Sequence, residues 1–164
     1  MMKNVRASVK DAIFCAVSMY GAAWLAFLFA MIPLYIFRGG YHNSANKEMY
    51  ENLLQSVVGI VLTTVFLTLI YRQRDEMGKK SVREVTVSAL IGGGIYGLVW
   101  IVSGDSYLIS VNGHHLGILL SAQADGSPTF LGTVSGAIIS CSLYVVGVLI
   151  GSFFARRKRK KELR

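Results

Sequence analysis

Four long stretches of this 164-residue sequence lack any Asp, Glu, Lys, Arg or His. They cover about 12–37, 53–71, 85–103 and 132–155. A helix rises about 1.5 Å per residue, so about 20 apolar residues cross a hydrocarbon core of about 30 Å. We therefore predict an all-α integral membrane protein, a single polytopic domain in which four transmembrane helices form a bundle.

The same lack of ionisable groups excludes several functions. Proton relays, ion-coupled transport sites and voltage sensors usually need charged or titratable side chains at membrane depth. The only two cysteines, Cys15 and Cys141, each lie in an apolar stretch, where they behave as small hydrophobic residues and indicate neither a disulfide nor a zinc site. Proline is equally scarce, and Pro33 should kink or end the first helix near its far end.

Motifs of catalysis are also lacking. Neither G-x-S-x-G nor H-E-x-x-H occurs. Gly92 to Gly97 matches G-x-G-x-x-G by letter, but it lies inside an apolar stretch, where a pyrophosphate would be stranded in hydrocarbon. His114 and His115 are adjacent, so in a strand their rings would point to opposite faces and would not converge on one ion. We predict no enzyme activity and no catalytic, cofactor-binding or metal site.

Basic residues are abundant, and their distribution predicts the topology. The N-terminal segment, the connector 72–84 and the tail 156–164 hold fifteen of the seventeen Lys and Arg residues. The other two connectors contain only Arg38 and Lys47. Cytoplasmic segments carry the excess of Lys and Arg, so both termini and the connector 72–84 should face the cytoplasm.

The tail 156–164 should end the fourth span and form a basic cytoplasmic segment that attracts anionic lipids of the inner leaflet. Nucleic acid is not an expected partner, because the basic residues are not interleaved with aromatic residues on a folded face. The lipid bilayer is the first partner that the sequence predicts. A multi-pass location in the cell membrane follows, and the short connectors favour the bacterial cytoplasmic membrane.

The two outer connectors are less regular. Residues 46–52 should form a short helical lead into the second span. Asn112-Gly113 is typical of a two-residue hairpin turn, so we expect a small β-hairpin in the outer loop between the third and fourth helices. The alternative is a re-entrant segment through 116–122, which is too short to span the bilayer.

Small residues recur at helical spacing in all four spans, for example Gly93 and Gly97 in the third and Gly147 and Gly151 in the fourth. Such spacing allows close approach of helix backbones in lipid. We expect another helix to lie against Gly93 and Gly97. The partner helices lie within one bundle or, as the alternative, in a homo-oligomer.

Three known classes of four-span protein are excluded. The chain lacks the paired outer cysteines of quinone-linked disulfide oxidases, the outer aspartate motifs of lipoprotein signal peptidases and the buried glutamate of small multidrug transporters. The leading hypothesis is a small non-catalytic membrane protein, an accessory subunit or an envelope or immunity factor, that acts by helix packing and partner binding. The alternative is a small homo-oligomeric channel or permease for a neutral or weakly polar solute. A membrane-embedded enzyme using outer His and acidic residues is the third.

The topology can be tested with single cysteines. In a chain whose two native cysteines are replaced, a cysteine at Ser127 should react with an impermeant thiol reagent added to intact cells, and a cysteine at Ser81 should not. Reaction at position 81 alone would contradict the predicted topology.

Overall fold

The computed structural model describes residues 2–37, 47–103 and 130–162, and over these ranges the chain is helical, without strands. The long helices are α1 (Met2–Phe37), α2 (Lys47–Gln73), α3 (Val82–Ser103) and α6 (Phe130–Glu162), and a short 3₁₀ helix, η1 (Asp75–Gly78), follows α2. Each long helix contains a segment that is long and apolar enough to cross a membrane. The predicted set of four apolar helices is therefore confirmed.

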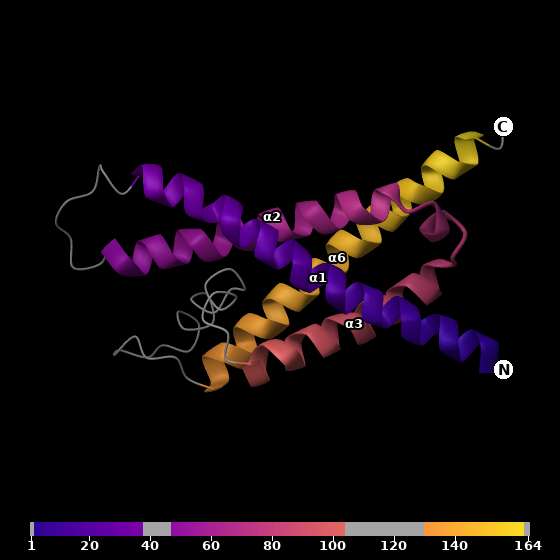
Figure 1. Ribbon diagram of the computed structural model, residues 1–164, viewed down its shortest axis with the longest axis horizontal. Coiled ribbons are helices and arrows are strands. Elements are labelled where there is room, and N and C mark those ends of the chain that lie inside the picture. The colour runs from indigo at the N-terminus through magenta and orange to yellow at the C-terminus, as the bar shows by residue number, and fades with distance from the viewer. Residues whose placement is uncertain (1, 38–46, 104–129, 163–164) are drawn as a thin grey trace.

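The helices form a bundle in which α1 and α6 each pack against both α2 and α3 (Figure 1). The N-terminus of α1, the connector with η1 and the C-terminus of α6 lie at one end of the bundle. The C-terminus of α3 and the N-terminus of α6 lie toward the other end. The three basic segments of the sequence are thus gathered at a single end, as the charge distribution requires.

At most of their ends the helices extend beyond the predicted apolar spans. Helix α1 continues through Pro33 to Phe37, so this proline does not end it. Membrane helices tolerate proline because neighbouring groups and small adjustments compensate for the one lost hydrogen bond. Helix α2 begins at Lys47, which confirms the predicted helical lead. Helix α6 continues through the basic tail to Glu162 instead of ending near Ala155, because Lys and Arg are good helix formers and suit a helix C-terminus.

The predicted β-hairpin, the re-entrant alternative and the histidine pair His114 and His115 lie outside the described residues. The same holds for most of the first outer connector.

The bundle core combines alanines with a few large side chains. Met19, Leu67, Tyr96 and Tyr144 are almost completely buried, and alanines of all helices except α2 fill the space around them. The buried hydroxyls of Thr63 and Ser140 bond to their own helices: Thr63 Oγ1 donates to the Gly59 carbonyl at 2.7 Å, and Ser140 Oγ donates to the Gly136 carbonyl at 2.8 Å. These two groups are satisfied locally, so they do not hinder a close approach of the helices.

Glycines of α6 mark the tightest contact of the bundle. A Cβ atom on Gly147 would lie 2.8 Å from the Thr64 carbonyl oxygen, and one on Gly151 would lie 2.5 Å from the Thr68 carbonyl oxygen. Both oxygens belong to α2. This ladder of small residues therefore serves packing within the chain, which agrees with the first of the two expected uses.

Candidate functional site

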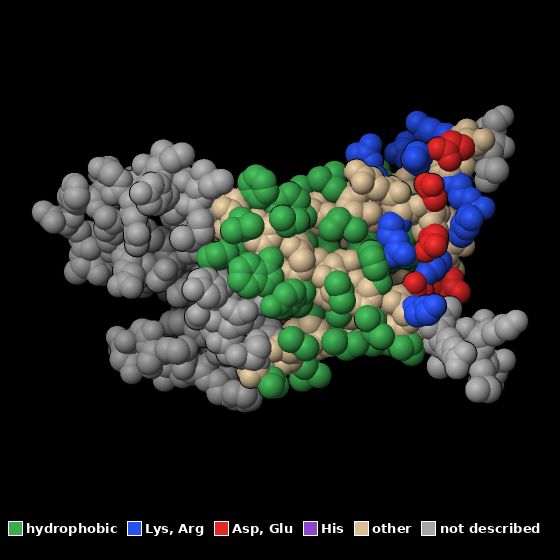
Figure 2. All heavy atoms as spheres, in the orientation of Figure 1, with side chains coloured by type: hydrophobic (Ala, Val, Ile, Leu, Met, Phe, Trp, Pro, Cys, Tyr) green, Lys and Arg blue, Asp and Glu red, His purple; other side chains and the backbone are tan. Residues whose placement is uncertain are grey.

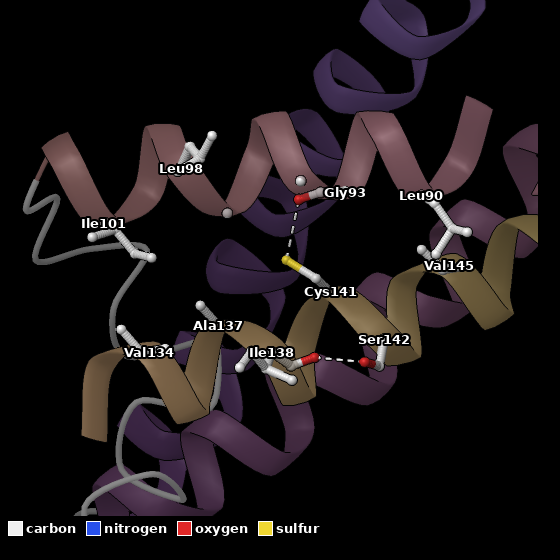
Figure 3. Close-up of a pocket in the computed structure, with 12 residues that line it drawn as sticks. Leu90, Gly93, Leu98, Ile101, Val134, Ala137, Ile138, Cys141, Ser142 and Val145 are labelled. Atoms are coloured by element: carbon white, nitrogen blue, oxygen red, sulfur yellow. Dashed lines mark hydrogen bonds between the residues drawn. The ribbon is translucent and has the colours of Figure 1, made fainter. Parts of the chain in front are cut away.

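A groove of about 310 Å³ lies between α3 and α6 (Figure 3). Its buried residues are Gly93 and Gly97 of α3 and Ala137 of α6. Exposed hydrophobic side chains flank them, among them Leu98 and Ile138. The groove is therefore an apolar depression in the side of the bundle, in the part of both helices that is apolar enough to lie in a membrane.

The groove exists because two positions of α3 that face α6, Gly93 and Gly97, carry no side chain. A Cβ atom on Gly93 would meet Val145 at 3.4 Å, and one on Gly97 would meet Cys141 Sγ at 3.2 Å. The expected approach of another helix to Gly93 and Gly97 is confirmed, and the helix is α6. Gly94, which also lines the groove, has nothing within 4 Å of its Cβ position. Its position is open for contact with another molecule.

The polar side chains of the groove are already engaged. The Cys141 thiol donates to the Gly93 carbonyl, with 3.4 Å between sulfur and oxygen, and Ser142 Oγ donates to the Ile138 carbonyl at 2.7 Å (Figure 3). Neither group is presented to a ligand as an unsatisfied donor. The groove therefore suits an apolar surface and offers no acid, base or nucleophile pair for catalysis.

No group of three or more His, Cys, Asp or Glu residues that would suit a metal ion occurs in the described part of the chain. The histidines considered from the sequence all lie outside that part.

In contrast to the apolar groove, one end of the bundle is rich in charged side chains (Figure 2). It is the end that holds the N-terminus of α1 and the C-terminus of α6 (Figure 1). There the connector packs onto α6 through η1. Met77 is buried, and the Gly78 backbone lies so close to α6 that a Cβ atom would be 3.3 Å from the Ala155 carbonyl oxygen. Arg159 donates to the Gly78 carbonyl at 3.4 Å. The connector is thus a packed cap and not a free loop.

An ion pair joins this cap to α1. The Lys80 ammonium contacts the Asp11 carboxylate, and their side chains are only 24% and 20% exposed. A cavity of about 10 Å³ adjoins the pair, with Cys15 and Tyr71 in its lining. A cavity of this size is about that of one water molecule. The pair therefore borders a small, mostly apolar cavity between the connector and the long helices.

Arg74 reinforces the same junction. Its guanidinium lies 3.7 Å from the centroid of the Phe14 ring on α1, and it pairs with Glu76 at 3.0 Å. A cation over an aromatic face is attracted by the ring quadrupole. The connector is therefore held to α1 by two different kinds of contact.

Two features of the charged end were not predicted from the sequence. Ser81 and Glu84 form a capping box: Ser81 Oγ accepts from the Glu84 N–H at 3.2 Å, and Glu84 Oε2 accepts from the Ser81 N–H at 2.8 Å. The S-x-x-E spacing is a recognisable signal, and it would have placed the start of α3 at Val82 and not at Val85. The Asp11–Lys80 pair has no comparable signal, because 69 positions of sequence separate its members.

Comparison of the chain with protein-family models, with curated proteins and with solved structures finds no match. The function is therefore inferred from the groove and the charged end themselves.

Proposed function

We propose that this protein is a non-catalytic integral membrane protein of the bacterial cytoplasmic membrane that acts by packing against a membrane partner. One observation carries the proposal, the apolar groove between α3 and α6 with Gly94 open at its side. The partner is a second copy of the chain or another membrane protein. An accessory, envelope or immunity role is consistent with such binding.

Physical chemistry favours a helix as the partner of this groove. Between helices in lipid there is little hydrophobic driving force, so association depends on close contact and dispersion. A glycine that faces outward lets a second backbone come near, and Gly94 has no intramolecular neighbour that would block it. Leu90 and Leu98, one turn before and after Gly94, are exposed and would flank an incoming helix.

The proposed orientation places the charged end in the cytoplasm, with both termini inside. It is supported by the grouping of the three basic segments at one end of the bundle together with the excess of Lys and Arg in cytoplasmic segments. The groove then lies within the bilayer, where only lipid or another membrane-embedded segment can reach it.

The change Gly94→Leu tests the groove. A leucine there should fill the open side of the groove without a clash in its own chain, since nothing lies within 4 Å of the Cβ position. We expect association between copies labelled with donor and acceptor fluorophores, reconstituted together in lipid vesicles, to weaken about tenfold. The thermal stability of the protein in detergent should stay unchanged.

Gly21→Leu is the matched control. Gly21 is also an exposed helical glycine with nothing within 4 Å, but it lies on α1 and does not line the groove. Equal energy transfer for both variants and the unaltered protein would contradict binding of a second copy in the groove. Uptake of glycerol by vesicles containing the unaltered protein, abolished by Gly94→Leu, would favour the channel alternative instead.

A further inference from the structure

The outward face of α6 changes character along its length. Leu143, Val146, Ile150, Phe153 and Phe154 are all exposed. Their spacing of three and four residues places them on one face of the helix. This face is apolar throughout, aliphatic from Leu143 to Ile150 and then formed by two phenylalanines shortly before the first cation of the tail.

Continuing the same spacing leads to Arg157, Lys160 and Lys161. These three residues lie three to eight positions beyond Phe153 and Phe154, still within α6, and all are exposed. Among the described residues they form no ion pair and no hydrogen bond. Arg72 of α2 adds a further cation beside this face, with its guanidinium 5.9 Å from the centroid of the Phe154 ring.

The other three cations of the run 156–161 are engaged within the chain. Arg156 donates to the Ser152 carbonyl of its own helix at 3.3 Å, and Arg159 donates to the Gly78 carbonyl of the connector at 3.4 Å. Lys158 lies 3.9 Å from the Asp75 carboxylate and 3.7 Å from Glu162. Because residues 156–161 continue α6, their six cations fall on different sides of the helix. Arg156, Lys158 and Arg159 form an engaged set with contacts inside the protein, and Arg157, Lys160 and Lys161 form an outward set without them in the described part of the chain.

We propose that the outward set, Arg157, Lys160 and Lys161, binds the phosphates of anionic phospholipid headgroups, whereas the engaged set makes contacts within the protein, two of them to the connector. This inference rests on one part of the proposed function, that the protein lies in a membrane. It does not depend on which partner binds the groove. It concerns three named residues of one face and not the total charge of the tail.

Distances along the helix match this binding mode. Three to eight residues correspond to roughly 5–12 Å of helical rise beyond the phenylalanines. The headgroup region on each side of a bilayer is roughly 5–8 Å thick, so Arg157 lies within it when Phe153 and Phe154 lie at the edge of the hydrocarbon, and the backbones of Lys160 and Lys161 lie just beyond it. Side chains of a helix point toward its N-terminus, so both lysine side chains extend back toward the phosphates. Because the face is continuous with the lipid-exposed stripe, the anions that it meets are those of the membrane itself.

The experiment uses the purified full-length chain in detergent micelles with increasing amounts of phosphatidylglycerol or phosphatidylcholine. Native mass spectrometry counts the bound lipids, and thermal denaturation reports stability. The outward triple variant is Arg157→Gln with Lys160→Gln and Lys161→Gln. The control triple variant is Arg156→Gln with Lys158→Gln and Arg159→Gln, which removes the same charge from the engaged set.

The outward variant should lose roughly 100-fold in affinity for phosphatidylglycerol at low salt, about fivefold for each cation, and keep its stability in phosphatidylcholine. The control variant should keep most of the preference for phosphatidylglycerol and denature at a lower temperature. Arg159→Gln alone serves as the control should the triple variant not fold.

Equal losses of lipid preference in the two sets would overturn the proposal, since total charge would then explain the binding. An unchanged preference in the outward variant would overturn it as well. Neither outcome bears on the groove, because association through Gly94 is measured in a separate experiment, by energy transfer between labelled copies.

Discussion

Replacing Gly92 by alanine should lower the free energy of unfolding by about 2 kcal/mol relative to the same replacement at Gly94. A Cβ atom on Gly92 would lie 2.6 Å from Cys15 Cβ and 2.8 Å from the Ala12 carbonyl oxygen, both on α1. These neighbours include backbone, so relief requires α1 to move away from α3. Unfolding of the purified protein by titration with sodium dodecyl sulfate, followed by circular dichroism, would measure the difference.

Gly94→Ala is the control, because it is the same replacement on the same helix but at a position without the close contact to α1. Both replacements sit in the middle of α3, and both gain about 1 kcal/mol in helix propensity over glycine. At Gly94 no neighbouring atom clashes with the added methyl group, so the gain in helix propensity is kept. That variant should be as stable as the unaltered chain or more stable. If Gly92→Ala were as stable as Gly94→Ala, α1 and α3 would not be in the close contact described above.

Gly92, Gly93 and Gly94 show which part of the packing cannot be predicted from the sequence. Their small size predicts close packing somewhere, but it does not say which partner each one meets. In the structure Gly92 faces α1, Gly93 faces α6 and Gly94 faces outward. These assignments depend on how α3 is rotated within the bundle, which the contacts of all four helices decide together. The groove could therefore not be located from the residues alone.

The four helices themselves could be predicted because the bilayer imposes a simple rule. In hydrocarbon the backbone groups must be satisfied within the helix, so a long uncharged stretch has few other structures available. Their ends were less predictable, because a helix does not end where its apolar stretch ends. Cations such as Arg157 and Lys160 favour continued helix, and α6 accordingly runs on to Glu162.

From its charges, the sequence predicts the segment between α2 and α3 only as a basic connector. Its one large apolar residue, Met77, is buried against the bundle and makes the connector a cap. A single methionine among charged residues carries too little periodicity to predict this from sequence. The outcome matters for the proposed lipid contact, because the cap packs against α6 at Ala155 and Arg159, next to the outward cations.

The Asp11–Lys80 ion pair should contribute more to stability than a surface pair of the same two residue types. Asp11→Asn leaves the Lys80 ammonium partly buried without its carboxylate, so we expect a loss of about 2 kcal/mol. Lys80→Gln should cost a similar amount. In the double variant the two losses should not add, and a double-mutant cycle should give a coupling energy of about 1 kcal/mol or more.

Asp75 and Lys158 provide the matched control for this cycle. They are also an aspartate and a lysine at the charged end, 3.9 Å apart, but their side chains are 84% and 60% exposed. Solvent screens such a pair, so Asp75→Asn should change stability by less than about 0.5 kcal/mol. Denaturant titration of the three single variants and the Asp11–Lys80 double variant supplies every value needed. Equal effects of Asp11→Asn and Asp75→Asn would show that the connector is not fastened to α1 through Lys80, and the contact of Arg74 with Phe14 would then be the remaining attachment.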